Sequence, residues 1–279
     1  MNPSDVVQQG SRKQLINGVE IAYEDLGSGP AVVLLHGYPF NRSLWRDQLN
    51  ALRRDFRVIV PDLRGHGESA VTSDAASMEA MAKDVAALLD RLNISAATIG
   101  GLSMGGYVAL AFYRLFPARV ESLVLAATRA QADTEEAKKN RAVQAEKART
   151  EGMEGIADTM LPKLLTPETV AKRPEVVKHV RGMMASTNPE GAAAALQGMA
   201  MRQDQTSLLP QITAPTLILV GREDVITPVA DAESMHREIS GSQLRVIENA
   251  GHVVNLERPE EFNLALSEFL KTRGPNGTA

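Results

Sequence analysis

Short apolar runs alternate along this chain with stretches whose apolar residues recur at helical spacing. The runs, which are typical of strands buried on both faces of a sheet, are residues 31–35, 57–60, 96–99, 122–126 and 216–220. The stretches with helical spacing include residues 43–54, 77–92 and 108–116. This repeated strand–helix order predicts an α/β fold with a mostly parallel, doubly wound sheet and right-handed crossovers.

Different patterns occupy the two ends of this series. Residues 13–16 and 19–25 alternate around Asn17-Gly18, a dipeptide that strongly favours a β-hairpin. After the run at 216–220, the chain predicts a helix over 230–239, a strand over 243–247 and a helix over 259–270. The sheet is therefore expected to begin with a hairpin and to end with a further strand.

The alternation of strands and helices stops at Thr128 and resumes only near Ala214. Thr166-Pro167-Glu168 and Asn188-Pro189-Glu190 both combine a cap residue, a first-turn proline and an acidic residue, which is the signature of a helix start. We therefore expect a helical cap over residues 128–210, inserted after the sixth strand. The core would be one discontinuous domain, 12–127 and 211–272.

Residues 99–107 contain a serine flanked by glycines two positions before and two positions after, Gly101-x-Ser103-x-Gly105. Between a strand and a helix this pattern indicates a nucleophile elbow. The serine occupies a strained turn, and larger flanking residues would collide with the neighbouring strand and helix. Two other interpretations are a phosphate-binding loop and an ordinary glycine turn. The first lacks both Gly-Lys-Ser/Thr and the G-x-G-x-x-G spacing.

A serine hydroxyl is too weakly acidic to attack a carbonyl carbon unaided, so it needs a base and an acid that orients the base. His252 follows the last predicted strand and is the candidate base, whereas His36 is expected to be a hydrogen-bonding brace. Asp224 follows the strand at 216–220 and is the candidate acid, with Asp62 as a weaker alternative. The chain order Ser, Asp, His is the order expected for a nucleophile elbow.

Two backbone N–H groups are expected to form an oxyanion hole: that of Met104, which follows the serine, and that of Tyr38, in the loop after the strand at 31–35. Six of the eleven methionines lie between residues 153 and 201 and could give the cap a flexible apolar wall. The expected substrate pocket comprises Tyr38, Met160, Met184, Ile226 and Val253. Arginines that could hold a second carboxylate in the fold are Arg129, Arg141 and Arg202.

Composition removes several classes of function. The 279 residues contain no cysteine, which excludes disulfides, thiolate metal sites and a cysteine nucleophile. A net charge of −4 gives no case for nucleic acid, and no polybasic run suggests a membrane surface. Residues 1–20 are polar, without the apolar core typical of a signal peptide, and no apolar span of about 18 residues occurs in the sequence. We expect a cytoplasmic monomer or small homo-oligomer that needs no cofactor and no metal.

Taken together, the motifs resemble those of the α/β-hydrolase superfamily. The residues that carry the resemblance are 36–39, 61–69, 101–106, 221–224 and 249–252. The elbow with a short helical cap is similar to that of carboxylesterases and 3-oxoadipate enol-lactonases, and cofactor-free perhydrolases share much of the pattern. Serine at position 103 argues against haloalkane dehalogenases and epoxide hydrolases, which place an aspartate there.

These observations favour a serine carboxylesterase that acts on short- to medium-chain esters, a small-molecule substrate. Ser103 would be the nucleophile, His252 the base and Asp224 the residue that orients it. An enol-lactonase or a perhydrolase with the same triad is the alternative within this fold. A ligand receptor is an alternative of a different class, because such receptors can retain the triad.

Overall fold

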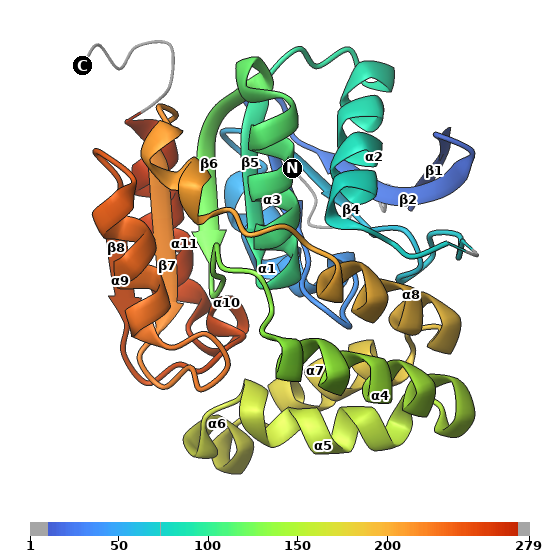
Figure 1. Ribbon diagram of the computed structural model, residues 1–279. Coiled ribbons are helices and arrows are strands. Elements are labelled where there is room, and N and C mark those ends of the chain that lie inside the picture. Colours follow the sequence, from blue (N-terminus) through green and yellow to red (C-terminus); the bar gives the residue numbers. More distant parts are fainter. Residues whose placement is uncertain (1–10, 73, 273–279) are drawn as a thin grey trace, which may run out of the picture.

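The structure is a computed structural model that describes residues 11–72 and 74–272. At its centre is an eight-stranded sheet in the order β1-β2-β4-β3-β5-β6-β7-β8 (Figure 1). β2 pairs antiparallel with β1 and β4, and the other neighbouring strands are parallel, which confirms the predicted mostly parallel sheet. The strands are β1 (Arg12–Ile16), β2 (Val19–Leu26), β3 (Ala31–Leu35), β4 (Arg57–Pro61), β5 (Ala97–Leu102), β6 (Val120–Ala126), β7 (Thr216–Gly221) and β8 (Gln243–Ile247).

Helices cover both faces of the sheet, and its central strands are largely apolar. Val33 and Leu35 of β3 join one buried cluster with α2, α3 and α9, whereas Val32 and Leu34 join a second cluster with α1, α10 and α11. Successive side chains of a strand point to opposite faces, and here both faces exclude water. These helices are α1 (Arg46–Leu52), α2 (Met78–Arg91), α3 (Met104–Leu115), α9 (Val229–Glu238), α10 (Val254–Glu257) and α11 (Pro259–Lys271).

Between β6 and β7 lies a helical segment, called the cap segment here. In Figure 1 it lies at the end of the sheet towards which the arrowheads of β6 and β7 point. Thr166 and Asn188 cap two of its helices, as predicted. The division into a discontinuous core and a separate cap remains a prediction. The cap segment contains α4 (Glu135–Glu151), α5 (Glu154–Leu164), α6 (Pro167–Lys172), α7 (Pro174–Ala185), α8 (Pro189–Ala200) and the 3₁₀ helix η3 (Thr206–Gln211).

The structure differs from the sequence prediction at three helices. The helix expected over 43–54 begins as a 3₁₀ turn, η1 (Arg42–Trp45), and α3 begins at Met104 rather than at Val108. α10 was not predicted, because four residues are too few to display a helical period.

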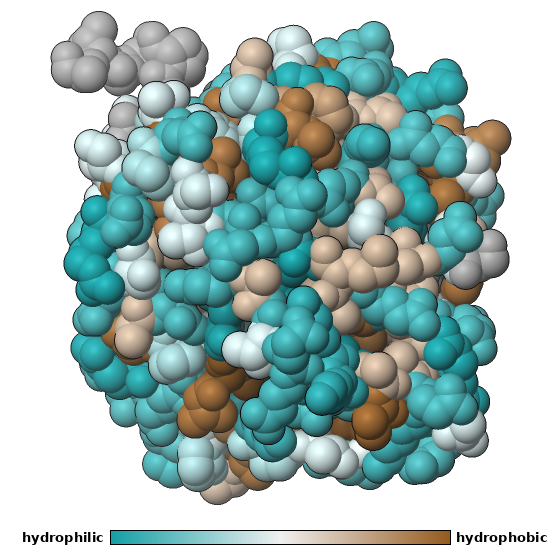
Figure 2. Space-filling model, in the orientation of Figure 1, coloured by the Kyte–Doolittle hydropathy of each residue, from teal (hydrophilic) through white to brown (hydrophobic). Residues whose placement is uncertain are grey.

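Figure 2 shows one face of the molecule, which is largely hydrophilic. Hydrophobic residues are visible in its upper part and also in its lower part, the region of the cap segment in Figure 1. Across residues 11–72 and 74–272, no helix has the length and apolar character needed to cross a membrane.

Candidate active site

Ser103 stands on a sharp turn between β5 and α3. Its φ of 55° and ψ of −113° lie in a region of backbone conformation that residues with a side chain rarely adopt. The turn is held by bonds from Ser103 N–H to the Ala126 carbonyl (2.9 Å) and from the Thr128 hydroxyl to the Ser103 carbonyl (2.9 Å). A Cβ at Gly101 would lie 2.1 Å from the backbone of Gly105, so the turn requires glycine there. The predicted strand–turn–helix context of the serine is confirmed.

The loop after β3 lies directly against this turn. A Cβ at Gly37 would lie 3.3 Å from the Cβ of Ser103. The loop that contains the neighbouring Tyr38 therefore passes close to Ser103. Met104 is the first residue of α3, and the first N–H groups of a helix have no acceptor within the helix. The two expected oxyanion donors therefore belong to segments that meet at Ser103; their role stays a prediction.

Asp224 and His252 form a buried hydrogen-bonded pair. Their side chains come from the loops after the adjacent strands β7 and β8, and the distance from Asp224 Oδ2 to His252 Nδ1 is 2.9 Å. The Thr227 hydroxyl also donates to Asp224 Oδ2 (2.6 Å), while the N–H groups of Ile226 and Thr227 donate to Oδ1 at 2.8 and 2.9 Å. These bonds hold the carboxylate in one orientation.

Electrostatics keep Asp224 ionised. Burial alone raises the pKa of its carboxyl group, but the charge of His252 and the hydrogen bonds from His252 and Thr227 hold this pKa below its ordinary value. An ionised carboxylate accepts a hydrogen bond from Nδ1–H, which leaves Nε2 as the basic nitrogen of the imidazole. The pair is therefore arranged as an acid that orients a base.

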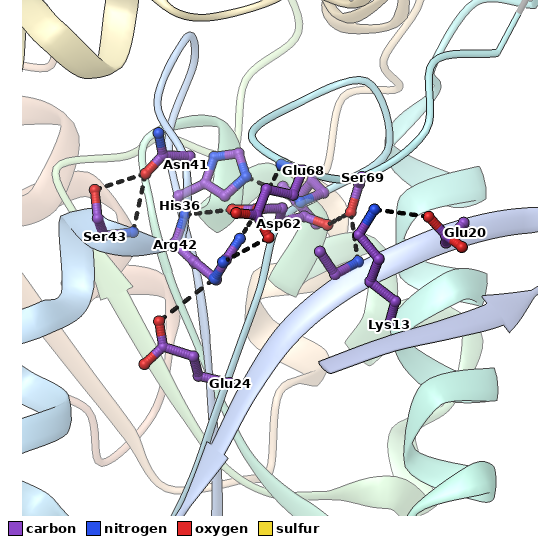
Figure 3. A network of polar contacts seen from close by, with 12 residues as sticks. Lys13, Glu20, Glu24, His36, Asn41, Arg42, Ser43, Asp62, Glu68 and Ser69 are labelled. Carbon is purple, nitrogen blue, oxygen red and sulfur yellow. Dashed lines mark hydrogen bonds and ion pairs between the residues drawn. The ribbon is translucent and has the colours of Figure 1, made fainter. Parts of the chain in front are cut away.

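The competing acidic residues do not share this arrangement. The Glu223 side chain is exposed. Asp62 is fully buried, but it accepts hydrogen bonds from the N–H groups of Arg42 (2.6 Å) and Glu68 (2.8 Å) and pairs with the Arg42 guanidinium. Figure 3 shows this network around Asp62, which also reaches Glu24 through Arg42. Asp62 therefore fixes its own glycine-rich loop.

His36 acts as the brace that the sequence predicted. Its Nε2 accepts a hydrogen bond from the Leu63 N–H (2.9 Å), and its Nδ1 lies 2.9 Å from the Gly37 carbonyl. The His36 and His66 rings are 5.0 Å apart, and both are buried. Burial lowers the pKa of His36 to about 4 and that of His66 to about 3, with the neighbouring His36 adding to the second shift. Both rings are neutral at pH 7 and join the loop after β3 to the loop after β4.

Two buried residues beside His252 were not found from the sequence. Thr227 contacts both Asp224 Oδ2 and His252 Nδ1. Glu257, in the unpredicted α10, is fully buried and accepts from the Gly251 N–H (2.6 Å), the Thr166 N–H (2.8 Å) and the Thr166 hydroxyl (3.0 Å). An acidic residue directly after the mostly apolar stretch 253–256 was the available signal, but its partner Thr166 lies 91 residues away.

The expected pocket residues belong to two different apolar clusters. Met184 and Val253 are buried in the cluster with α1, α10 and α11, and Ile226 packs against it. Tyr38 belongs to the cluster with α2, α3 and α9. Met160 packs against both clusters, so it lies where they approach one another. That these residues line one substrate pocket remains a prediction.

The three candidate arginines form ion pairs at two different places. Arg129 pairs with Asp231 (3.1 Å) and donates to the Ile226 carbonyl, so it supports the loop of Asp224. Arg141 and Arg202 instead share the single carboxylate of Asp133, the Arg202 pair measuring 2.7 Å. Sequence alone could not separate these roles, because the partners Asp133 and Asp231 come from distant elements.

Comparison with known proteins agrees with this geometry. The family described as "alpha/beta hydrolase fold" matches residues 30–259, and the chain belongs to that family. The fold and the family model thus place the chain among the α/β-hydrolases, and the relatives support a hydrolytic enzyme. In the described residues, no group of three or more histidine, aspartate or glutamate side chains is arranged to hold a metal ion.

The similar proteins include esterases and enol-lactonases. A thermophilic esterase from Thermogutta terrifontis, solved with malate bound, is 46% identical with a TM-score of 0.92, over 95% of this chain and 99% of that one. The enol-lactonase from Burkholderia xenovorans is 32% identical with a TM-score of 0.87, over 93% of this chain and 100% of that one. The 3-oxoadipate enol-lactonase 2 of Acinetobacter baylyi is 32% identical over 91% of this chain and 94% of its own length.

Proposed function

We propose that this protein is a serine carboxylesterase that hydrolyses short- to medium-chain carboxylic esters through an acyl-enzyme. The observation that carries the proposal is the buried 2.9 Å contact between Asp224 and His252, which follow β7 and β8, two and three strands along the sheet from the strand β5 that leads to a serine held at positive φ. A strained serine on a strand–helix turn has no structural purpose of its own, whereas it suits a nucleophile.

In the first half of the reaction, Ser103 Oγ attacks the carbonyl carbon of the ester and its proton passes to Nε2 of His252. The carbonyl oxygen becomes an oxyanion, which the backbone N–H groups of Tyr38 and Met104 stabilise. When the intermediate collapses, the carbon–oxygen bond to the alcohol breaks. The alcohol leaves with the proton from His252, and the acyl group stays on Ser103.

In the second half, His252 takes a proton from a water molecule, which attacks the acyl-enzyme. A second oxyanion forms in the same place and collapses to release the carboxylic acid, while Ser103 regains its proton from His252. Asp224 keeps the imidazole in the required tautomer and stabilises its cationic form. All proton transfers thus use one nitrogen of one residue.

An enol-lactonase is the second candidate, and the enol-lactonases among the similar proteins favour it. A lactone is a cyclic ester, so the same residues would open it and the leaving alcohol would remain attached to the acid. A perhydrolase with the same triad and a ligand receptor on the hydrolase fold are further alternatives. The perhydrolase would differ from the first proposal in the molecule that accepts the acyl group, and the receptor would differ in that no turnover occurs.

The test compares hydrolysis of p-nitrophenyl acetate, butyrate and octanoate by the wild type, Ser103→Ala and Ser95→Ala. Ser95 has an exposed side chain, so its variant controls for the loss of a hydroxyl. We expect Ser103→Ala to lose at least about a thousandfold in kcat and Ser95→Ala to lose nothing. Unchanged hydrolysis by Ser103→Ala would refute the nucleophile assignment.

Two further measurements separate the alternatives. A higher kcat/KM for a muconolactone-type enol-lactone than for any p-nitrophenyl ester would make the protein a lactonase. A compound that raises Tm without being turned over, together with no hydrolysis of any ester by the wild type, would favour the receptor. Labelling of Ser103 by a fluorophosphonate, located by peptide mass spectrometry, is expected for both enzymes.

A further inference from the structure

The peptide unit between Gly37 and Tyr38 carries the N–H group that is proposed to stabilise the oxyanion. The carbonyl of this unit, that of Gly37, has two hydrogen-bond partners: the Phe40 N–H donates to it at 2.9 Å, and Nδ1 of His36 lies 2.9 Å away. Because Nε2 of His36 accepts from the Leu63 N–H, the proton of the neutral imidazole is on Nδ1, which donates to the Gly37 carbonyl. The donor's own peptide unit is therefore fixed from its oxygen side.

A side chain of the cap segment binds the next peptide unit of the same turn. This unit contains the Phe40 N–H and the Pro39 carbonyl, and the Thr187 hydroxyl donates to that carbonyl at 2.7 Å. Thr187 is only 4% exposed, so little water competes for the bond. The same hydroxyl lies 3.0 Å from the Met183 carbonyl in α7, which is the longer of its two contacts. The shorter bond thus joins the cap segment to the loop after β3.

These contacts form one continuous chain of hydrogen bonds that ends at the proposed oxyanion. The Thr187 hydroxyl donates to the Pro39 carbonyl, and the N–H of that peptide unit donates to the Gly37 carbonyl. The N–H of the second peptide unit is that of Tyr38. Resonance couples the oxygen and nitrogen of a peptide unit, and successive hydrogen bonds polarise one another, so a bond to the oxygen makes the N–H a better donor. The chain therefore orients the Tyr38 N–H and strengthens it.

Thr187 is itself held in place, because it directly precedes the part of the cap segment that packs most closely on the core. It lies between α7 and α8, and a Cβ at Gly191 in α8 would lie 1.9 Å from the Gly65 carbonyl oxygen. The Ala76 N–H also donates to the Ala194 carbonyl of α8 at 3.1 Å. The helix thus touches the loop after β4 backbone to backbone, and Thr187 is a fixed point for the loop after β3.

We propose that Thr187 is a positioning residue of the oxyanion hole, which acts on the Tyr38 N–H through the Pro39 and Gly37 carbonyls. This inference rests on the proposed ester hydrolysis and adds to it a residue of the cap segment. The alternative is that Thr187 only closes the C-terminal end of α7, where the last carbonyls have no partner within the helix. That alternative predicts a loss of stability alone, whereas a positioning residue affects the stabilisation of the oxyanion.

Two ketones separate stabilisation of the oxyanion from binding of the chain. Ser103 Oγ adds to the carbonyl carbon of 1,1,1-trifluoro-2-heptanone, its proton passes to Nε2 of His252, and the carbonyl oxygen becomes an oxyanion in the hole. The compound 2-heptanone has the same carbon chain but binds mainly as the intact ketone. The measured quantities are Ki for each ketone, together with kcat and KM for p-nitrophenyl butyrate. The ratio of the two Ki values reports the oxyanion hole.

Thr187→Val keeps the shape of the side chain and removes the hydroxyl. Loss of a whole oxyanion donor costs about a hundred- to a thousandfold in kcat, and here the donor is only displaced and weakened. We therefore expect kcat to fall about tenfold with KM nearly unchanged. Ki for the trifluoromethyl ketone should rise by a similar factor, while Ki for 2-heptanone stays the same. Thr187→Ser retains the hydroxyl and should restore most of kcat and of the Ki ratio.

Two control variants have matched defects outside the chain of hydrogen bonds. Thr159→Val makes the same substitution in α5, where the hydroxyl donates to the Gly155 carbonyl of its own helix at 2.8 Å. His179→Phe removes another contact between α7 and the core, the 3.2 Å bond from His179 Nε2 to the Ser43 carbonyl. Neither variant should change the Ki ratio, even if His179→Phe lowers Tm.

If Thr187→Val lowers Tm but keeps the wild-type Ki ratio, Thr187 only closes α7, and the inference is refuted while ester hydrolysis stands. An equal change of the ratio in His179→Phe would refute the route through Pro39. Should Thr187→Val fail to fold, Thr187→Cys decides in its place, because a thiol is close in size to the hydroxyl but is a weak donor. Failure of the proposed function itself would appear differently, as unchanged ester hydrolysis by Ser103→Ala.

Discussion

The carboxylate of Glu257 accepts a hydrogen bond of 2.6 Å from the backbone N–H of Gly251, the residue that precedes His252. The same side chain binds the backbone and hydroxyl of Thr166 in the cap segment. His252 is joined to that segment as well, through its own N–H and the Leu164 carbonyl at 3.0 Å. The loop of the proposed base is therefore fixed from the cap side.

Glu257→Gln tests this connection. The amide nitrogen of glutamine would face N–H groups that need an acceptor, so at least one buried donor would lose its partner. We expect the free energy of unfolding to fall by about 1–3 kcal/mol, measured in urea, and kcat to fall because the His252 loop is held less firmly. Glu260→Gln, at an exposed position of α11, should stay within about 0.5 kcal/mol of the wild type. Equal stability of the two variants would contradict the prediction.

Thr227→Val tests the orientation of Asp224. Valine keeps the shape of threonine but removes the hydroxyl that donates to Asp224 Oδ2 at 2.6 Å. We expect kcat for a p-nitrophenyl ester to fall about tenfold, as for the loss of one hydrogen bond to a charged group, with KM nearly unchanged. Thr227→Ser should restore most of kcat. A rise in KM together with the fall in kcat, or no rescue by serine, would indicate a packing defect instead.

Glycine-to-alanine substitutions should have opposite effects at two positions. In Gly101→Ala the new Cβ would lie 2.1 Å from the backbone of Gly105, and neither backbone can yield without moving Ser103. We expect a loss of about 3 kcal/mol or more in stability, together with loss of activity. Gly182 lies exposed in α7, and a methyl group there would meet no atom of another element within 4 Å, so Gly182→Ala should add about 0.5–1 kcal/mol. Thermal unfolding of both variants checks the pair.

The sequence predicts best those features that depend on local periodicity. The strands at 31–35 and 243–247 have the expected bounds, because a short run between turn residues leaves little choice of register. Asp224 and His252 could be paired because both follow strands, and parallel strands end at one edge of the sheet. Glu257 could not be found in this way. Its contact with Thr166 depends on how the cap segment packs, and no local sequence pattern predicts that packing.

The buried histidines predict how stability depends on pH. The folded-state pKa values of about 4 for His36 and about 3 for His66 lie below the value of about 6.5 for an unfolded chain. As the pH falls below that value, the unfolded chain binds protons that the folded protein excludes, so stability falls. Each ring contributes up to about 1.4 kcal/mol per pH unit. Urea unfolding between pH 6 and 5 should show this slope. In His66→Asn the amide can still donate to the Arg64 carbonyl, and the slope should be smaller by nearly the contribution of one ring. An unchanged slope would mean that His66 is protonated in the folded protein.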